Sequence, residues 1–300
     1  MPSPKRKPSI RARREHMGIP LGDVAKALGV SELELTRWET SLTGVSDIHL
    51  RDLAVFYELN VSDLLGAKSR KDAVIRDRFA LRDLPGPLYG TLRLVFAWGI
   101  REYPISEAAR ERTLSRIDCF DVQNEEPKTS WIMAETMNNR LLFINADHLE
   151  GIELIGDDAE ASPPYEHPEA YRAMSWIEME DAEFGPILQG AVDRLIEAHT
   201  SQEGAIRAAN STLAINSRGR KSLYDMIELD DTVGPFDLEM ACEEMMPRNG
   251  LVRLMSEGYY VAKYVNLRNI ALLEIPLEAY LRACGAAEMR AAHSGQTAHF

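Results

Sequence analysis

The sequence predicts an α+β multidomain protein, in which an all-α N-terminal domain precedes a duplicated small antiparallel β-barrel unit with a helical connector. Three observations predict this architecture. Apolar side chains recur at helical spacing early in the chain, charge is divided unevenly along it, and two later segments align without a gap. A length of 300 residues suits two or three domains of roughly 100–150 residues each.

The charge distribution separates a basic arm from an acidic body. The chain carries a formal net charge of -13, which excludes a histone-like or ribosomal type of protein. Residues 1–14 nevertheless contain six basic and no acidic side chains, and residues 15–66 contain three basic and nine acidic ones. The segment 1–66 is therefore neutral as a whole, and the negative excess belongs to residues 67–300. We expect residues 1–9 to form a basic arm that can approach an anionic partner.

The N-terminal domain, residues 10–66, is predicted to contain five short helices. Gly29 is expected to end the second helix in a left-handed conformation, because glycine adopts positive φ without steric cost. Ser31 is expected to cap the third helix. The predicted helices are 10–17, 21–28, 32–39, 47–59 and a last turn capped by Ser62.

These residues resemble the helix-turn-helix of phage-repressor-like proteins, the XRE family of Cro/cI type. The resemblance rests on the runs GIPLGDVAKALGVSELELTRWE and LRDLAVFYELNVSDLLG, and covers about 60 of the 300 residues. It implies a DNA-binding domain whose third helix enters the major groove, and operator binding by a dimer. It also implies a structural ion pair between Arg14 and Glu39.

The residues expected to contact DNA include several departures from the family pattern. Leu21 stands where the family has a glutamine, and Glu32 and Glu34 would oppose phosphates. Glu34 would instead accept from a cytosine amine, and Leu33 would touch a thymine methyl group. The candidate DNA-binding residues are Lys5, Arg6, Lys7, Leu21, Ser31, Glu32, Leu33, Glu34, Thr36 and Arg37.

The same departures support a second hypothesis, in which the helix-turn-helix no longer reads DNA. In that case the protein is an interaction adaptor, and its third helix docks a protein or the acidic body. Leu21, Glu32 and Glu34 favour the adaptor, whereas the basic residues from Lys5 to Arg14 favour DNA binding.

The C-terminal body contains a tandem repeat with an offset of 121 residues. LLFINADHLEGIELI, residues 141–155, aligns with AKYVNLRNIALLEIP, residues 262–276. Alternating apolar and polar residues predict five short strands per copy, which favours an SH3-like or Sm-like barrel. The predicted segments are a linker at 67–85, a first barrel at 86–160, a helical connector at 161–210, a second barrel at 211–285 and a flexible tail at 286–300.

Asn145 and Asn266 occupy equivalent positions in the two copies. The closing hairpin of each copy resembles that of Sm-like barrels, which implies a third hypothesis, an RNA-binding protein that uses these asparagines. The alternative is a local turn, in which each side chain satisfies backbone amides. The acidic body argues against RNA.

The chain shows no sign of catalysis. Its seven histidines are scattered, and it has no HExxH, GxSxG, Walker A or GxGxxG motif, so we expect no enzyme, no metal and no cofactor. Three distant cysteines point to a reducing cytoplasm, and no apolar run is long enough for a membrane span. The expected partners are double-stranded DNA, further copies of the chain in a homo-oligomer, and a protein bound by the C-terminal body.

Overall fold

The computed structural model describes residues 10–61, 64, 87–117, 131–156, 162–175, 177, 183–225, 249–257 and 261–281. The chain divides into two compact units. We call Met1–Leu84 with Glu166–Ile206 the helical unit, and Pro85–Tyr165 with Arg207–Phe300 the β unit. The predicted arm, linker and tail, and the last turn at Ser62, lie outside the described residues.

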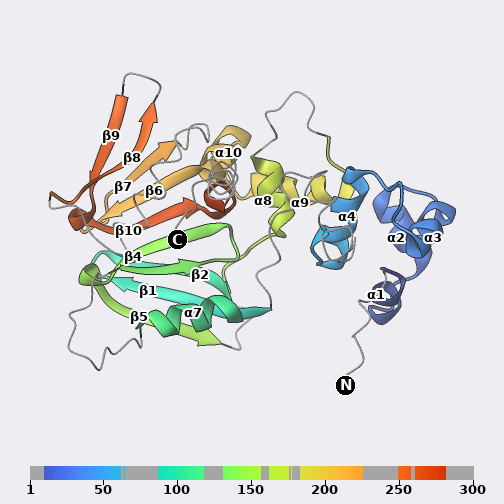
Figure 1. Ribbon diagram of the computed structural model, residues 1–300, viewed down its shortest axis with the longest axis horizontal. Helices are drawn as coiled ribbons and strands as arrows, with labels where there is room; N and C mark the ends of the chain where they lie inside the picture. The colour runs from blue at the N-terminus through green and yellow to red at the C-terminus, as the bar shows by residue number, and fades with distance from the viewer. Residues whose placement is uncertain are drawn as a thin grey trace, which may run out of the picture. The chain divides into compact units, whose positions relative to one another are not determined.

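The helical unit begins with four helices whose ends follow from local chemistry. Gly29, at φ 69°, ends the second helix as predicted. The fourth helix is two residues shorter than expected, because Glu58 adopts a left-handed conformation with φ 53° and the helix stops before it. The helices are α1 Ile10–His16, α2 Leu21–Leu28, α3 Glu32–Thr40 and α4 Asp47–Tyr57 (Figure 1).

One hydrophobic core holds these helices together. Its members come from every helix, and burial of such side chains contributes roughly 1.5–3 kcal/mol each. The most deeply buried members are Val24, Leu28, Leu35, Leu53, Ala54 and Tyr57.

The later helices of the helical unit pack on this bundle. They are α8 Pro168–Met174 and α9 Pro186–Glu197, and α9 lies beside α4 (Figure 1). The Asp52 carboxylate, which is fully buried, accepts from the backbone N–H of Leu188 at 2.9 Å. A Cβ on Gly185 would overlap that carboxylate, so only glycine fits there. The segment that the sequence predicts to connect two barrels therefore groups, through residues 166–206, with the N-terminal helices.

The strands of the β unit follow one order twice. The order is a hairpin, a second hairpin, a 3-10 turn and a closing strand. The first half has β1 Leu88–Phe96, β2 Gly99–Ser106, α7 Glu107–Ile117, β3 Trp131–Glu135, β4 Arg140–Asn145, η1 Ala146–His148 and β5 Leu149–Gly156. After α10 Gln202–Asn210, the second half has β6 Ser211–Asn216, β7 Lys221–Asp225, β8 Leu251–Glu257, β9 Val261–Asn266, η2 Leu267–Asn269 and β10 Ile270–Pro276.

The expected closed barrels are not seen among the described strands. The sheets are open and antiparallel, with strand orders β2-β1-β5, β3-β4-β10-β6-β7 and β8-β9. The reason is that β4 of the first half pairs with β10 of the second half rather than closing its own half. Strands from the two halves thus share one five-stranded sheet (Figure 1).

Candidate nucleic-acid interface

The α2–α3 turn is fixed by backbone chemistry at both of its ends. After Gly29, the N–H of Val30 donates to the Ala25 carbonyl at 2.9 Å, which closes the end of α2. Ala25 is almost fully buried, so its small side chain lets α2 and α3 pack closely. The turn therefore sets the direction in which α3 leaves the bundle.

The beginning of α3 carries a capping box. Ser31 Oγ accepts from the Glu34 N–H at 3.2 Å, and Glu34 Oε2 accepts from the Ser31 N–H at 3.0 Å and from its hydroxyl at 2.8 Å. The hydrogen bonds that Glu34 accepts from Ser31 lower its pKa, and the bond from the backbone N–H has the larger effect. The sequence predicts that Glu34 meets a cytosine, and that contact stays a prediction. In the structure one of its carboxylate oxygens caps α3, which the S-x-x-E spacing indicates.

The outer face of α3 is open to solvent. The exposed fraction of Leu33 is 63%, the highest among the large hydrophobic residues in the described part of the chain. Glu32 and Arg37 are exposed beside it, and Thr36 turns its hydroxyl inward to the Glu32 carbonyl at 2.7 Å. Four candidate residues, Glu32, Leu33, Thr36 and Arg37, therefore lie together on one exposed helix face.

Leu21 differs from these residues. It is the first residue of α2, it is half-buried, and it packs against the core of the bundle. Its position follows from its apolar side chain, since leucine has no polar atom with which to hold a phosphate.

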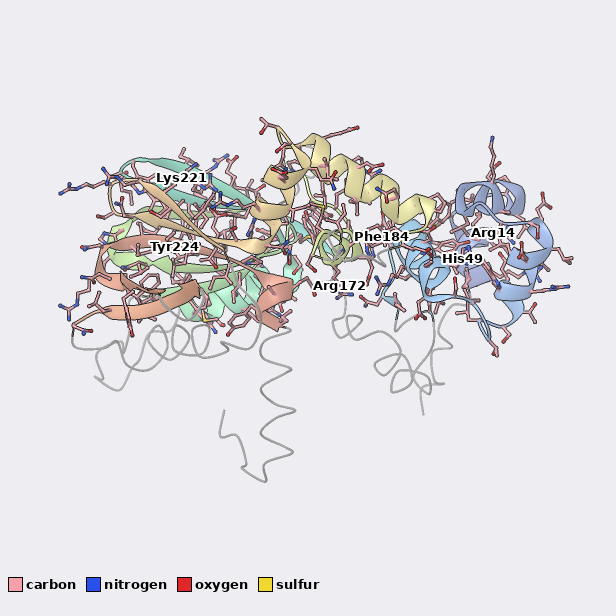
Figure 2. The ribbon with its side chains drawn as sticks, turned by 90° about the horizontal axis from the view of Figure 1, so that it is seen from above. Arg14, His49, Arg172, Phe184, Lys221 and Tyr224 are labelled. Atoms are coloured by element: carbon pink, nitrogen blue, oxygen red, sulfur yellow. The ribbon has the colours of Figure 1, made fainter. Side chains whose placement is uncertain are left out.

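Arg14 and Glu39 meet inside the bundle. Arg14, labelled in Figure 2, donates from Nε to Glu39 Oε1 at 2.6 Å and from Nη2 to Glu39 Oε2 at 3.2 Å, so the pair is bidentate. Arg14 Nη1 also donates to the Ile19 carbonyl at 3.1 Å. The hydrogen bond to Glu39 raises the pKa of Arg14. These contacts tie α1 to the end of α3 and withdraw one arginine from any ligand.

Other basic residues of α1 are engaged in the same way. Arg13 donates to the Tyr57 carbonyl at 3.3 Å, and exposed Arg11 pairs with Glu15 at 2.8 Å. Lys5, Arg6 and Lys7 lie outside the described residues. Among the described residues of α2 and α3, Lys26 and Arg37 are the exposed cations.

Comparison with known proteins identifies the bundle. Residues 10–64 match a family model described as Helix-turn-helix. These residues form an XRE-type helix-turn-helix domain. The family is a DNA-binding regulatory one. No curated protein and no solved structure matches the chain.

Outside the helix-turn-helix domain, the two recurring asparagines form local turns. Asn145 Oδ1 accepts from the Asp147 N–H and Asn266 Oδ1 accepts from the Arg268 N–H, each at 3.1 Å. Both bonds close the 3-10 turns η1 and η2. The turn interpretation thus accounts for both side chains without a base contact.

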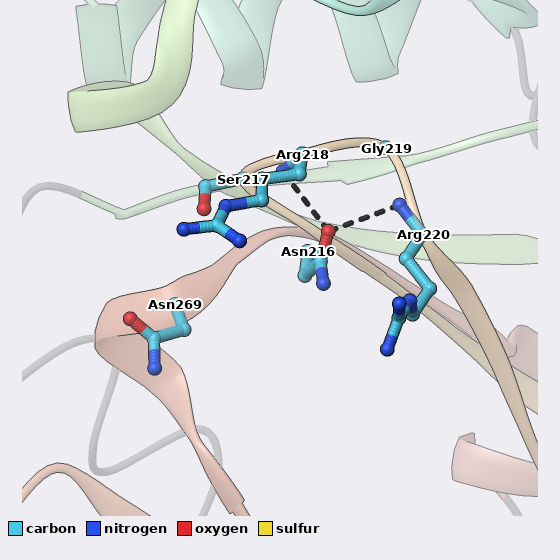
Figure 3. A pocket seen from close by; sticks show the side chains of 6 residues that line it. All are labelled: Asn216, Ser217, Arg218, Gly219, Arg220 and Asn269. Atoms are coloured by element: carbon cyan, nitrogen blue, oxygen red, sulfur yellow. Dashed lines mark hydrogen bonds between the residues drawn. The ribbon is translucent and has the colours of Figure 1, made fainter.

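A pocket of about 570 Å³ lies at the β6–β7 turn of the β unit (Figure 3). Asn216 Oδ1 accepts from the backbone N–H groups of Arg218 and Arg220, each at 2.9 Å, so its oxygen is committed to the turn. The residues that line the pocket are Asn216, Ser217, Arg218, Gly219, Arg220 and Asn269.

No group of three or more metal-ligating side chains occurs within the described residues. No described helix could span a membrane.

Proposed function

We propose that this protein is a sequence-specific, DNA-binding transcriptional regulator of XRE type that acts in the cytoplasm. The observation that carries the proposal is the exposed outer face of α3, held at a defined angle by the Gly29 turn and the capping box. In such domains the N-terminal part of the recognition helix faces base edges in the major groove.

The chemistry of that face suggests which residue does what. Leu33 meets a thymine methyl group, and Arg37 contacts a phosphate or a guanine. Ser31 and Thr36 lie beside them. The Glu32 carboxylate is repelled by hydrogen-bond acceptors on bases, so it disfavours DNA sequences that place such an acceptor next to it. Leu21 fixes the start of α2 through packing.

The basic arm supplies most of the affinity in this proposal. The described part of the domain offers few exposed cations near α3, because Arg13 and Arg14 are used inside the bundle. Phosphate neutralisation dominates the affinity of DNA-binding proteins. We therefore assign phosphate contacts to Lys5, Arg6 and Lys7 of the basic arm.

The β unit serves assembly in this proposal. We infer that its two halves arose by duplication, because β4, η1 and the start of β5 recur as β9, η2 and the start of β10 with one offset of 121 residues. Its function is to hold several helix-turn-helix domains in one homo-oligomer or to bind a protein partner. It needs neither a cofactor nor catalysis.

The test is the salt dependence of binding to the upstream region of the protein's own gene. Replacing Lys5, Arg6 and Lys7 together by alanine should lower the slope of log K against log salt by about 2–3, since each phosphate contact contributes about 0.9. Arg37→Ala should cost about 1–3 kcal/mol if it reads a guanine. Arg218→Ala removes the same charge from the β unit and should leave binding unchanged.

The adaptor remains the second candidate, because Leu33 is exposed next to Glu32 on the recognition helix. An apolar side chain beside a carboxylate suits a protein partner as well as a base. Absence of any binding to DNA at low salt would contradict the regulator and support the adaptor.

A further inference from the structure

Each sheet of the β unit ends in strands that have one side without a partner strand in the described structure, and β5 and β9 are two of these strands. β5 ends the sheet β2-β1-β5, and β9 ends the sheet β8-β9. Within the described residues β5 and β9 do not pair with each other, and in Figure 1 the two strands run away from each other. An open edge strand presents a row of unpaired backbone groups and is a template for another strand.

The chain already contains one joint between the corresponding strands. β4 corresponds to β9, and β10 corresponds to β5, each with the 121-residue offset. β4 and β10 pair antiparallel, with Phe143 opposite Leu273. The first half thus contributes β4 to this joint, and the second half contributes β10. Their counterparts, β9 and β5, are the strands whose edges stay open in the described structure.

Side chains at the existing joint are buried, whereas their counterparts at the open edges are exposed. Trp131 and Phe143 leave their own half and pack into the core of the other half, with exposed fractions of 7% and 0%. Trp131 stands opposite Asn145, as Leu251 stands opposite Asn266. Tyr264, which the offset aligns with Phe143, has an exposed fraction of 59%, and Leu251, at the pairing position of Trp131, has one of 42%. Val252, which the offset of 121 residues aligns with Trp131, is buried.

The closing strands show the same contrast. Every residue of β10 is buried, since β4 covers one side and β6 the other. No residue of β5 is fully buried, although its apolar positions match those of β10. β5 thus shares apolar residues with β10 at positions 149, 152 and 154, whereas Glu150 and Gly151 stand where β10 has Ala271 and Leu272.

A side-chain hydrogen bond also crosses the existing joint. Asn145 Nδ2 donates to the Ile270 carbonyl at 3.1 Å, while its Oδ1 holds the η1 turn. Asn266 holds the η2 turn with the same atom and the same distance. The counterpart of Ile270 is Leu149, at the start of β5. The amide of Asn266 and the carbonyl of Leu149 are thus the groups equivalent to this donor and this acceptor.

We propose that β9 of one chain pairs with β5 of a second copy of this chain, in the register of β4 with β10. This register places Tyr264 opposite Ile152 and Val265 opposite Gly151. The interface joins the β9 edge of one chain to the β5 edge of the next, and each chain has one edge of each kind. Such a head-to-tail interface gives a closed ring when a whole number of equal rotations from one chain to the next completes 360°. The inference deepens the proposed oligomerisation and does not depend on DNA binding.

The first test measures the mass of the full chain in solution by light scattering, without DNA. The expected mass of the wild-type protein is a multiple of the 33.7 kDa of one chain. Tyr264→Asp should reduce it to one chain, and because Tyr264 is exposed the variant should fold, as circular dichroism would show. Leu223→Asp is the matched control. Leu223 has an exposed fraction of 49% and lies on β7, a strand that the proposed interface does not include, so this variant should keep the wild-type mass. A monomeric wild type, or an assembled Tyr264→Asp variant, overturns the proposal.

The second test addresses the register. Chains carrying Ile152→Cys are mixed with chains carrying Tyr264→Cys, oxidised, and analysed by peptide mass spectrometry. A disulfide between positions 152 and 264 is expected, because opposite residues have the short Cα separation that disulfides need. Chains with Glu150→Cys are two residues out of register and should give about tenfold less disulfide with position 264. Equal yields from both mixtures overturn the register, and the absence of the 152–264 bond overturns the pairing. Since neither test uses DNA, a failure here is distinguishable from a failure of DNA binding.

Discussion

Single residues of the helical unit carry chemistry that solution conditions can reveal. His167 caps α8, where its Nδ1 accepts from the Glu169 N–H at 3.1 Å. Burial first, and then the charge of Arg172, lower the pKa of His167 to about 4, while the nearby Leu59 backbone opposes the shift. The imidazole is therefore neutral in the folded state at pH values where the unfolded chain is protonated.

The linkage predicts acid lability of the helical unit. The unfolded state binds a proton at His167 as pH falls below about 6.5, and the folded state does so only near pH 4, so stability declines across this window. The loss should reach about 2–3 kcal/mol. In His167→Asn, which keeps a capping acceptor but does not titrate, this loss should disappear. Denaturant unfolding of both proteins at pH 7 and pH 4.5 measures the difference, and equal pH dependence of the two would refute the assignment.

The recognition helix shows the same principle at Glu34. Its carboxylate is fixed by Ser31, so a side chain that looks available for DNA is partly committed to folding. Arg37 and Leu33 are exposed on the same helix, and their contact with DNA stays a prediction.

At the scale of elements, one buried carboxylate decides how α9 docks on the helix-turn-helix domain. Asp52 lies on α4 and accepts from the first backbone N–H groups of α9, at 2.9 Å from Leu188 and 3.4 Å from Ile187. Burial raises the pKa of Asp52, and the two backbone bonds act against that rise. The residue therefore caps a helix that is distant in sequence, since α9 begins only at Pro186.

Removing that cap should loosen α9. We expect Asp52→Ala to lower the free energy of unfolding of the helical unit by about 1–3 kcal/mol, because two buried donors lose their acceptor. Asp52→Asn keeps one acceptor oxygen and should cost less. Chemical denaturation followed by circular dichroism compares the three proteins. An alanine variant as stable as the wild type would mean that water satisfies the end of α9.

Local chemistry made some elements predictable, and long-range pairing made others unpredictable. The bounds of α2 and the capping of α3 at Ser31 follow from glycine and serine at fixed positions, and the sequence analysis placed both correctly. The end of α4 was wrong by two residues, since nothing in the sequence marks Glu58 for a left-handed conformation. The closed barrels are not confirmed among the described strands, because β4 pairs with β10 of the other half of the β unit, and periodicity contains no information on pairing.

The candidate site also combines features that follow from local sequence with features that depend on contacts in space. The exposed face of α3 follows from helical periodicity and was predicted. The capping role of Glu34, the internal role of Arg13 and the docking of α9 through Asp52 depend on contacts in space. Of these, only the capping box had a local signal.

At the scale of the whole molecule, the negative charge and the assembly have to be considered together. The excess of -13 lies on residues 67–300, whereas the segment 1–66 is neutral. A single helix-turn-helix domain with few free cations binds DNA weakly. Several such domains in one particle bind a long duplex more strongly, because the later contacts are intramolecular.

This reasoning predicts that strand pairing at β5 and β9 controls affinity for long DNA. The ratio of affinities for duplexes of about 60 and about 15 base pairs, at one salt concentration, should be at least on the order of 10² for the wild type. In Tyr264→Asp the affinity for the short duplex should be unchanged. The ratio of affinities should fall towards the value that results only from the larger number of binding sites on the long duplex. That statistical gain is the same for both proteins, so it cancels when the two ratios are compared. Fluorescence anisotropy measures all four affinities, and an unchanged ratio in the variant would show that assembly through these strands does not serve DNA binding.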